Sequence, residues 1–424
     1  MSRQRSVDSS RPASPPSSWT VELLDHLKAE TNPSDRQALQ ALAAHPWPSR
    51  QQESWRFTDL TPLLAVAPRR LAAPDRVVSP PGTSSASAKF VLHLDGATCP
   101  LHAVDLPDGL TPLAAEEANI ELNRVVEATR GQSHWSVLLN NAMNPPVLAL
   151  RVSGSIAPVI ELVSNAGAEP GVLPLRIQLI LEEGASLQLL QIHRSSGVNL
   201  TNVLVEVSLG AGSQLHHGLV AMGSGNGVLL SHLAVAQAKE SQLNHTSISS
   251  GWALARTEPR ILQIMGTAST RLRGLQLAKR KEVVDSHCLV KFGGPEGRLD
   301  QLHKSVADGA GRSLFRGGVE VPRQAQRTDA VQMSRNLLLS DRARIDTQPQ
   351  MEIVADDVKC AHGATVARLS EDEMFYLQSR GIAAPQAARL LMRGFCGEVL
   401  ANLPGPPRSW NPLEAWFEDE VNSR

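Results

Sequence analysis

Short runs of aliphatic residues fill the middle of the chain, from about residue 147 to residue 353. Clear examples lie at residues 147–152, 175–181 and 187–192. Runs of this length, rich in Leu, Val and Ile and bounded by small residues, are typical of β-strands. An earlier strand is expected at residues 90–94. The pattern therefore predicts a mainly β protein.

Clusters of small residues separate these strands at a near-constant interval. They lie at residues 184–186, 210–213, 238–241 and 266–269. The interval of about 26 to 28 residues lies in the range of solenoid repeats. Aromatic residues make up only 4% of the chain, which suits a ladder in which aliphatic side chains stack on one another. A β-sandwich is the competing architecture, but its repeat would be shorter.

Helical patterns come before and after the strands. At the start, residues 19–30 place Leu residues on one stripe, and a second helix is expected after a Ser34 cap. Parts of 114–129 and 135–141 also look helical. At the end, residues 370–373 form a capping box, Gly381 is a C-terminal stop, and further helices follow.

These patterns divide the chain into four parts. We expect a disordered tail at 1–17, a helical and mixed region at 18–145, a β-helix core at 146–355, and a C-terminal helical domain at 356–424. The final helix contains Trp416 and Phe417. The helices after Thr365 have a capped, amphipathic pattern that ends in these two residues, and it predicts more apolar surface than the cap of a solenoid needs, which is typical of a partner-binding surface.

Composition narrows the classes of function. The 424 residues have a net charge of −1, which argues against a nucleic-acid binder, and no apolar run is long enough to span a membrane. The four cysteines are scattered without a C-x-x-C motif, so neither a disulfide framework nor a structural zinc site is expected. A reducing compartment fits, and we expect the cytoplasm rather than the plastid stroma.

One thiol and one imidazole lie two residues apart, at Cys360 and His362. On an extended chain, side chains at alternate positions point to the same face. Sulfur and nitrogen donors side by side suit iron or zinc. The alternative is a buried Cys beside a His that is hydrogen-bonded in a turn. The preceding Asp356 and Asp357 are expected to form a turn.

Four motifs follow one another in this part of the chain, and the third contains the pair: N-L-L-L-S at 336–340, D-T-x-P-x-x-E-I at 346–353, A-D-D-V-K-C-x-H-G-A-T-V at 355–366 and F-Y-L-x-S-R-G-I at 375–382. Together they closely resemble the SufB/SufD family of iron–sulfur cluster assembly proteins, and the C-x-H-G-A-T-V ending looks like its SufD branch. E-x-W-R-x-T-x-L at residues 53–60 also resembles a motif of that branch.

The resemblance implies a right-handed parallel β-helix and a non-enzymatic scaffold subunit. It implies pairing with SufB through the β-helix and with the ATPase SufC through the C-terminal helices. A transient iron–sulfur cluster would be shared with SufB, and Cys360 and His362 would be candidate cluster-assembly ligands at that interface. ATP would act only through SufC, because the chain has no P-loop motif.

Other candidate residues are interpreted as structural. Trp55 is expected to pack without chemistry. Residues 285–288 resemble the D-x-H-T motif of the family, but this chain has Cys288 where the family has Thr. We assign Cys288 no role and expect His287 to be structural. His216 and His217 would point to opposite faces of a strand, so they are not expected to chelate together.

Two other functions compete with the SUF scaffold. A β-helical carbohydrate-active enzyme would need clustered carboxylates and aromatic platforms for sugars. Only Trp252 of the seven tryptophans lies in the repeat region, and the chain has one Tyr, which counts against that class. The other alternative is a homodimeric scaffold that acts without SufB.

Overall fold

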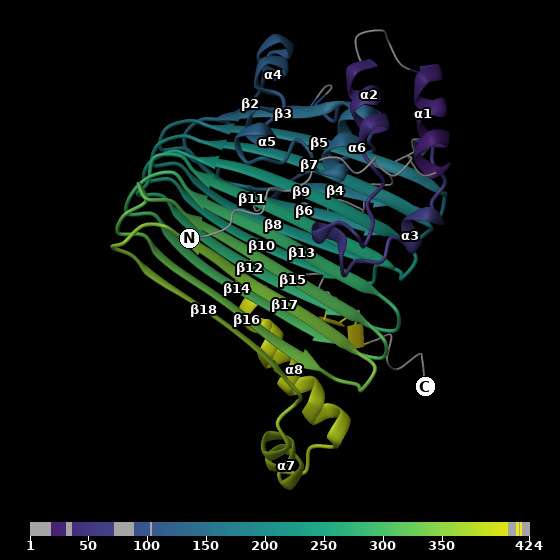
Figure 1. The fold of residues 1–424 in the computed structure, drawn as a ribbon, viewed down its shortest axis with the longest axis vertical. Helices are drawn as coiled ribbons and strands as arrows, with labels where there is room; N and C mark the ends of the chain where they lie inside the picture. Colours follow the sequence, from purple (N-terminus) through teal and green to yellow (C-terminus); the bar gives the residue numbers. More distant parts are fainter. Residues whose placement is uncertain are drawn as a thin grey trace, which may run out of the picture.

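The computed structural model describes residues 18–30, 36–71, 89–101, 104–405, 413–414 and 416–417. Within them the chain forms a parallel β-solenoid with helices from both ends of the sequence (Figure 1). The mainly β prediction is confirmed. The expected tail at 1–17 and the Ser34 cap lie outside the described residues.

Two nine-stranded sheets form the described solenoid, and from β3 onward successive strands alternate between them. All neighbouring strands are parallel except β2 and β3. One sheet, in chain order, contains β2 Leu110–Pro112, β3 Val147–Val152, β5 Gly171–Leu181, β7 Asn199–Leu209, β9 Val228–Gln237, β11 Leu254–Gln263, β13 Val283–Phe292, β15 Arg312–Val321 and β17 Arg344–Ile353. The other contains β1 Lys89–His93, β4 Val159–Ala166, β6 Ser186–Ser195, β8 Gln214–Gly223, β10 Gln242–Ser250, β12 Ser269–Ala278, β14 Arg298–Ala307, β16 Asp329–Leu338 and β18 Lys359–Ala367.

The corners of the solenoid repeat as the sequence predicts. Gly184, Gly212 and Glu240 follow one another at intervals of 28 residues, and each has a positive φ. The corners also stack, since the amide of Gly184 donates to the carbonyl of Ala211 (2.8 Å) and that of Gly212 to Lys239 (3.0 Å). Each coil therefore needs a left-handed residue at this corner, which glycine adopts without strain.

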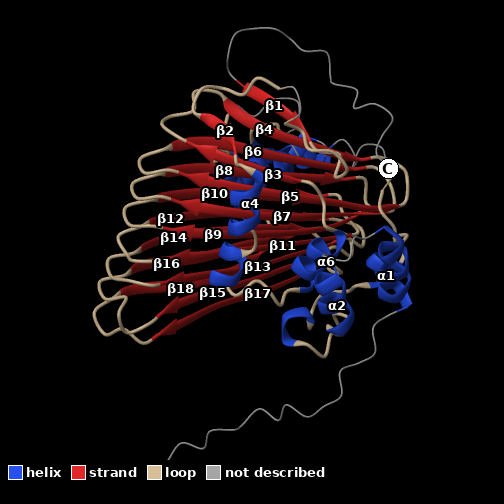
Figure 2. Ribbon diagram, turned by 90° about the horizontal axis from the view of Figure 1, so that it is seen from above, coloured by secondary structure: helices blue, strands red, loops and turns tan. Residues whose placement is uncertain are grey.

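Three apolar layers hold the fold together. Aliphatic side chains of both sheets fill the solenoid interior. The N-terminal helices cover the outer face of the sheet that contains β5, β7, β9 and β11 (Figure 2). Helix α8 packs on the outer face of the other sheet. The helices are α1 Ser18–Glu30, α2 Arg36–Ala44, η2 Glu53–Trp55, α3 Thr61–Leu64, α4 Ala115–Glu121, α5 Arg124–Ala128, α6 Trp135–Met143, α7 Glu371–Ser379 and α8 Ala384–Leu400.

Several helix signals act as expected. The side chain of Ser370 accepts a hydrogen bond from the amide of Glu373 at 3.3 Å, and Gly381 has a φ of 84° after α7. The helical pattern at 114–129 is divided between α4 and α5, because Asn123 adopts a left-handed conformation with a φ of 65°. Among the described residues, no helix is both long and apolar enough to cross a membrane.

The prediction that Trp416 and Phe417 contribute to an exposed apolar surface is wrong. Both side chains are buried, in a cluster with α8 and outward-facing residues such as Ile192 and Val220. Instead of facing a partner, these rings complete the layer on the solenoid. The ladder also continues past residue 355 to the end of β18, since Asp356 and Asp357 form a bend at one more corner.

Candidate functional site

Cys360 and His362 lie on β18, which with β17 forms the last pair of strands in the solenoid. In the register with β16, Ala330 pairs with Cys360 and Gln332 pairs with His362. Ala330 belongs to the interior cluster, and Cys360 packs against that cluster. Because directly paired residues point to the same side of a sheet, both candidate ligands share the face that lines the interior.

The two side chains differ in exposure. Cys360 is half-buried, whereas His362 is exposed. Burial, together with the nearby carboxylate of Asp329, raises the pKa of the Cys360 thiol. Since a metal binds the thiolate, ligation by Cys360 requires the loss of a proton that this environment retains.

Among the described residues, no third His, Cys, Asp or Glu donor lies close to this pair. The one group of three such donors found there lies elsewhere in the fold. Structural zinc sites and iron–sulfur clusters are commonly held by four protein donors. Cys360 and His362 therefore form an incomplete donor set at an end of the solenoid.

The histidines judged structural have defined partners. His216 binds the carbonyl of Asn402 (2.8 Å), while the ring of His217 stacks on His245, so the neighbouring pair does face opposite ways. Nε2 of His287 lies 3.1 Å from Oδ1 of Asp285. Burial raises the pKa of the Cys288 thiol to about 12.

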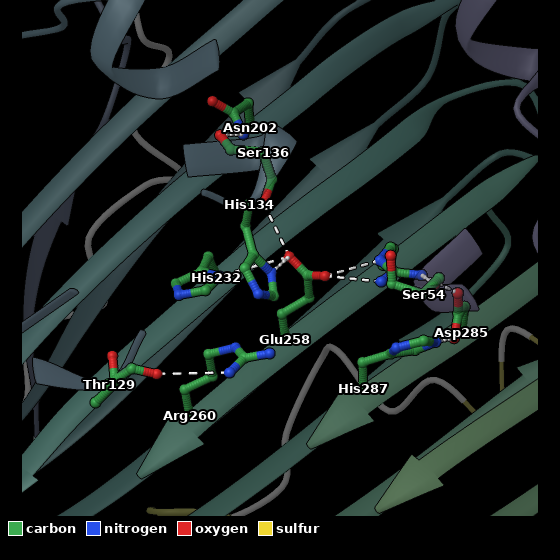
Figure 3. Close-up of polar contacts among 11 residues, drawn as sticks. Ser54, Thr129, His134, Ser136, Asn202, His232, Glu258, Arg260, Asp285 and His287 are labelled. Atoms are coloured by element: carbon green, nitrogen blue, oxygen red, sulfur yellow. Dashed lines mark hydrogen bonds and ion pairs between the residues drawn. The ribbon is translucent and has the colours of Figure 1, made fainter. Parts of the chain in front are cut away.

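A buried charged network lies on the outer face of β11 and β13, beneath the N-terminal region (Figure 3). Arg256 is at its centre: its guanidinium binds Glu258 at 2.8 Å and Asp285 at 2.6 Å, and it stacks 3.8 Å from the centroid of the Trp55 ring. Trp55 is thus buried as expected, but it packs on an ion network. The motif of residues 53–60 anchors the N-terminal region.

The carboxylates of this network stay charged. Burial alone would raise the pKa of Glu258, but His134 and Arg256 beside it hold that pKa well below its usual value. Burial likewise opposes ionisation of Asp285, yet His287 and Arg256 lower its pKa to about 2. The favourable charge pairing therefore outweighs desolvation for both carboxylates.

A pocket of about 450 Å³ opens beside the network. Its lining includes His134, Glu258, Arg260, His287 and Cys288. The sequence does not predict that these residues lie together, because they come from segments far apart in the chain, and His287 and Cys288 were each expected to have no functional role. The one available signal was the series of charges at alternate positions of β11, Arg256, Glu258 and Arg260, in a region otherwise rich in aliphatic residues.

Comparisons with known proteins place the chain in context. Residues 163–395 match the family described as "SUF system FeS cluster assembly, SufBD core domain". The chain is 29% identical over 384 residues to an iron–sulfur cluster assembly SufBD family protein of Synechocystis, with 84% of each chain covered. It is 29% identical to the chloroplastic protein ABCI7 of Arabidopsis thaliana, over 94% of this chain and 86% of the relative. It is 27% identical to the iron–sulfur cluster assembly protein SufD of Escherichia coli, over 87% of this chain and 88% of the relative.

Proposed function

The chain belongs to the SufBD core family of the SUF iron–sulfur cluster assembly system, and from this premise we propose that it is a scaffold subunit rather than an enzyme. In this proposal it pairs with SufB, and a transient iron–sulfur cluster forms between the two chains. ATP acts only through the partner ATPase SufC. The proposed compartment is the cytoplasm.

The observation that best supports pairing is the incomplete donor set on β18. Cys360 and His362 share the face that lines the solenoid interior, and β18 and β17 end their sheets. A terminal strand has backbone groups that can pair with another chain. A second chain docked at this end can supply both strand pairing and the missing cluster ligands.

Within the pair, His362 is the stronger candidate ligand. It is exposed, and a neutral imidazole binds iron without first losing a proton. Cys360 has a raised pKa, so its ligation depends on a partner or an iron ion that stabilises the thiolate. A ring nitrogen of His362 is therefore the first donor to bind the metal in this proposal, and the sulfur of Cys360 becomes a donor only when its thiol loses a proton.

The proposed SufC surface is on α7 rather than at Trp416 and Phe417. Phe375 and Tyr376 on α7 are 73% and 58% exposed, and α7 projects away from the solenoid (Figure 1). Large aromatic side chains exposed side by side are typical of protein–protein interfaces. Arg380, whose guanidinium lies 5.3 Å from the centroid of the Tyr376 ring, adds a charge at the edge of this surface.

Co-expression with SufB and SufC tests this assignment. We expect a complex of the three chains by size-exclusion chromatography, and a double variant with Phe375→Ser and Tyr376→Ser should lose SufC while keeping SufB. Ile120→Ser is the matched control, because Ile120 is 71% exposed on α4. A wild-type chain that forms a homodimer and no complex with SufB would contradict the pairing. Retention of SufC by the double variant would contradict the proposed surface.

A further inference from the structure

Three potential metal ligands meet beneath the N-terminal helices, far along the chain from Cys360 and His362. His134 precedes α6, His232 is on β9 and Glu258 is on β11. One ligand atom from each lies within 4.8 Å of the other two. The two imidazole rings meet edge to face, with centroids 5.2 Å apart (Figure 3). Both rings thus approach the same carboxylate without stacking on each other.

The carboxylate of Glu258 is held in a fixed orientation. Arg256 donates two hydrogen bonds to Oε1, at 2.9 and 2.8 Å. Oε2 therefore faces the histidines, with Nδ1 of His134 at 3.1 Å and Nδ1 of His232 at 3.5 Å. Ser136 donates to the same oxygen at 2.9 Å. Groups of this kind, which orient a ligand from behind, are typical of metal sites.

The charged side chains around the three ligands allow a cation to bind. Arg256 also binds Asp285 at 2.6 Å, so its positive charge has a counter-anion other than Glu258. The ring of His232 is fully buried, and its Nδ1 faces Oε2 of Glu258 at 3.5 Å. The positive charge of Arg260 would repel a cation. Its guanidinium, however, donates a hydrogen bond to the carbonyl of Thr129 at 3.5 Å rather than to Glu258. The negative charge on Glu258 can therefore neutralise part of the charge of a bound ion.

The surroundings allow further ligands. His134 and Glu258 line the pocket of about 450 Å³, so water can reach the open side of the three donors. Two imidazoles and one carboxylate with open positions suit ions such as Fe²⁺, Zn²⁺ and Co²⁺ rather than Ca²⁺ or Mg²⁺. We propose that His134, His232 and Glu258 bind one divalent transition-metal ion, at a site separate from Cys360 and His362. This proposal is independent of the scaffold function.

The test is a titration of the full-length chain with Co²⁺, whose visible absorption reports nitrogen and oxygen ligation. It is performed in the His362→Ala background so that the β18 pair loses one of its two donors. We expect one Co²⁺ per chain, displaced by Zn²⁺. His134→Ala should weaken binding at least about tenfold, because loss of a direct ligand costs no less than loss of an orienting partner. His45→Ala is the matched control, since His45 lines the pocket outside the three-ligand group.

Two further readouts separate ligation from a folding defect. His134→Asn keeps a polar side chain at this partly exposed position, and it should also lose Co²⁺. Zn²⁺ should raise the Tm of the His362→Ala chain and of the His45→Ala variant, but not that of the His134 variants, because only a folded chain with the site gains stability from the ion. Absence of stoichiometric Co²⁺ binding in the His362→Ala background would overturn the proposal. Equal binding by His134→Ala would overturn it as well.

Discussion

Replacing Arg256 with Ala should release the N-terminal region from the solenoid. The guanidinium is buried and binds Glu258, Asp285 and the carbonyl of Ser54, and it stacks on Trp55. Without it, two buried carboxylates lose the arginine that neutralises them. Breaking a buried ion pair by removing one partner costs about 3–5 kcal/mol, so we expect a loss of this size in the free energy of unfolding.

Urea unfolding followed by tryptophan fluorescence and circular dichroism measures this loss. Arg368→Ala is the matched control, because Arg368 pairs with Asp341 at an exposed position; such surface pairs contribute about 0–1 kcal/mol. The fluorescence change of the Arg256→Ala variant should begin at lower urea, since Trp55 loses its stacking partner. A free energy of unfolding for Arg256→Ala equal to that of Arg368→Ala would refute this reasoning.

Three further predictions concern stability and binding. The pKa of Asp285 falls from 3.8 to about 2 in the folded chain, so its contribution of about 2 kcal/mol is present above pH 3.8 and lost as the pH falls toward 2; this part of the pH dependence of unfolding should be absent from Asp285→Asn. Gly212→Ala should cost about 1 kcal/mol, and Glu240→Gly should stabilise the chain by a similar amount, because both corners have a positive φ; thermal unfolding compares the two. Phe375→Ser with Tyr376→Ser should change the free energy of unfolding by less than about 0.5 kcal/mol, while isothermal titration shows weaker SufC binding.

The solenoid could be predicted from the sequence because its corners repeat in the chain itself. What covers its faces could not. Every residue of β9 is buried, and a strand buried on both sides shows no alternation of apolar and polar residues that could indicate what packs outside. Trp416 and Phe417 show the same limit. Their apolar pattern fits an exposed surface or a buried layer, and the outcome depends on Ile192 and Val220, which are distant in sequence.

The candidate sites differ in the same way. The shared face of Cys360 and His362 followed from the alternation of side chains along one strand. The group of His134, His232 and Glu258 depends on a helix start and two strands meeting in space, and no local pattern specifies that meeting.

The iron and sulfide content of the co-expressed complex containing His362→Ala tests the central claim most directly. His93→Ala is the control, because His93 lies on β1, at the opposite end of the same sheet. The scaffold account predicts that the His362→Ala complex assembles with both partners but retains the cluster at least about tenfold less tightly, while the His93→Ala complex matches the wild type. Wild-type iron and sulfide in the His362→Ala complex, or failure of that complex to assemble, would contradict a ligand role for His362.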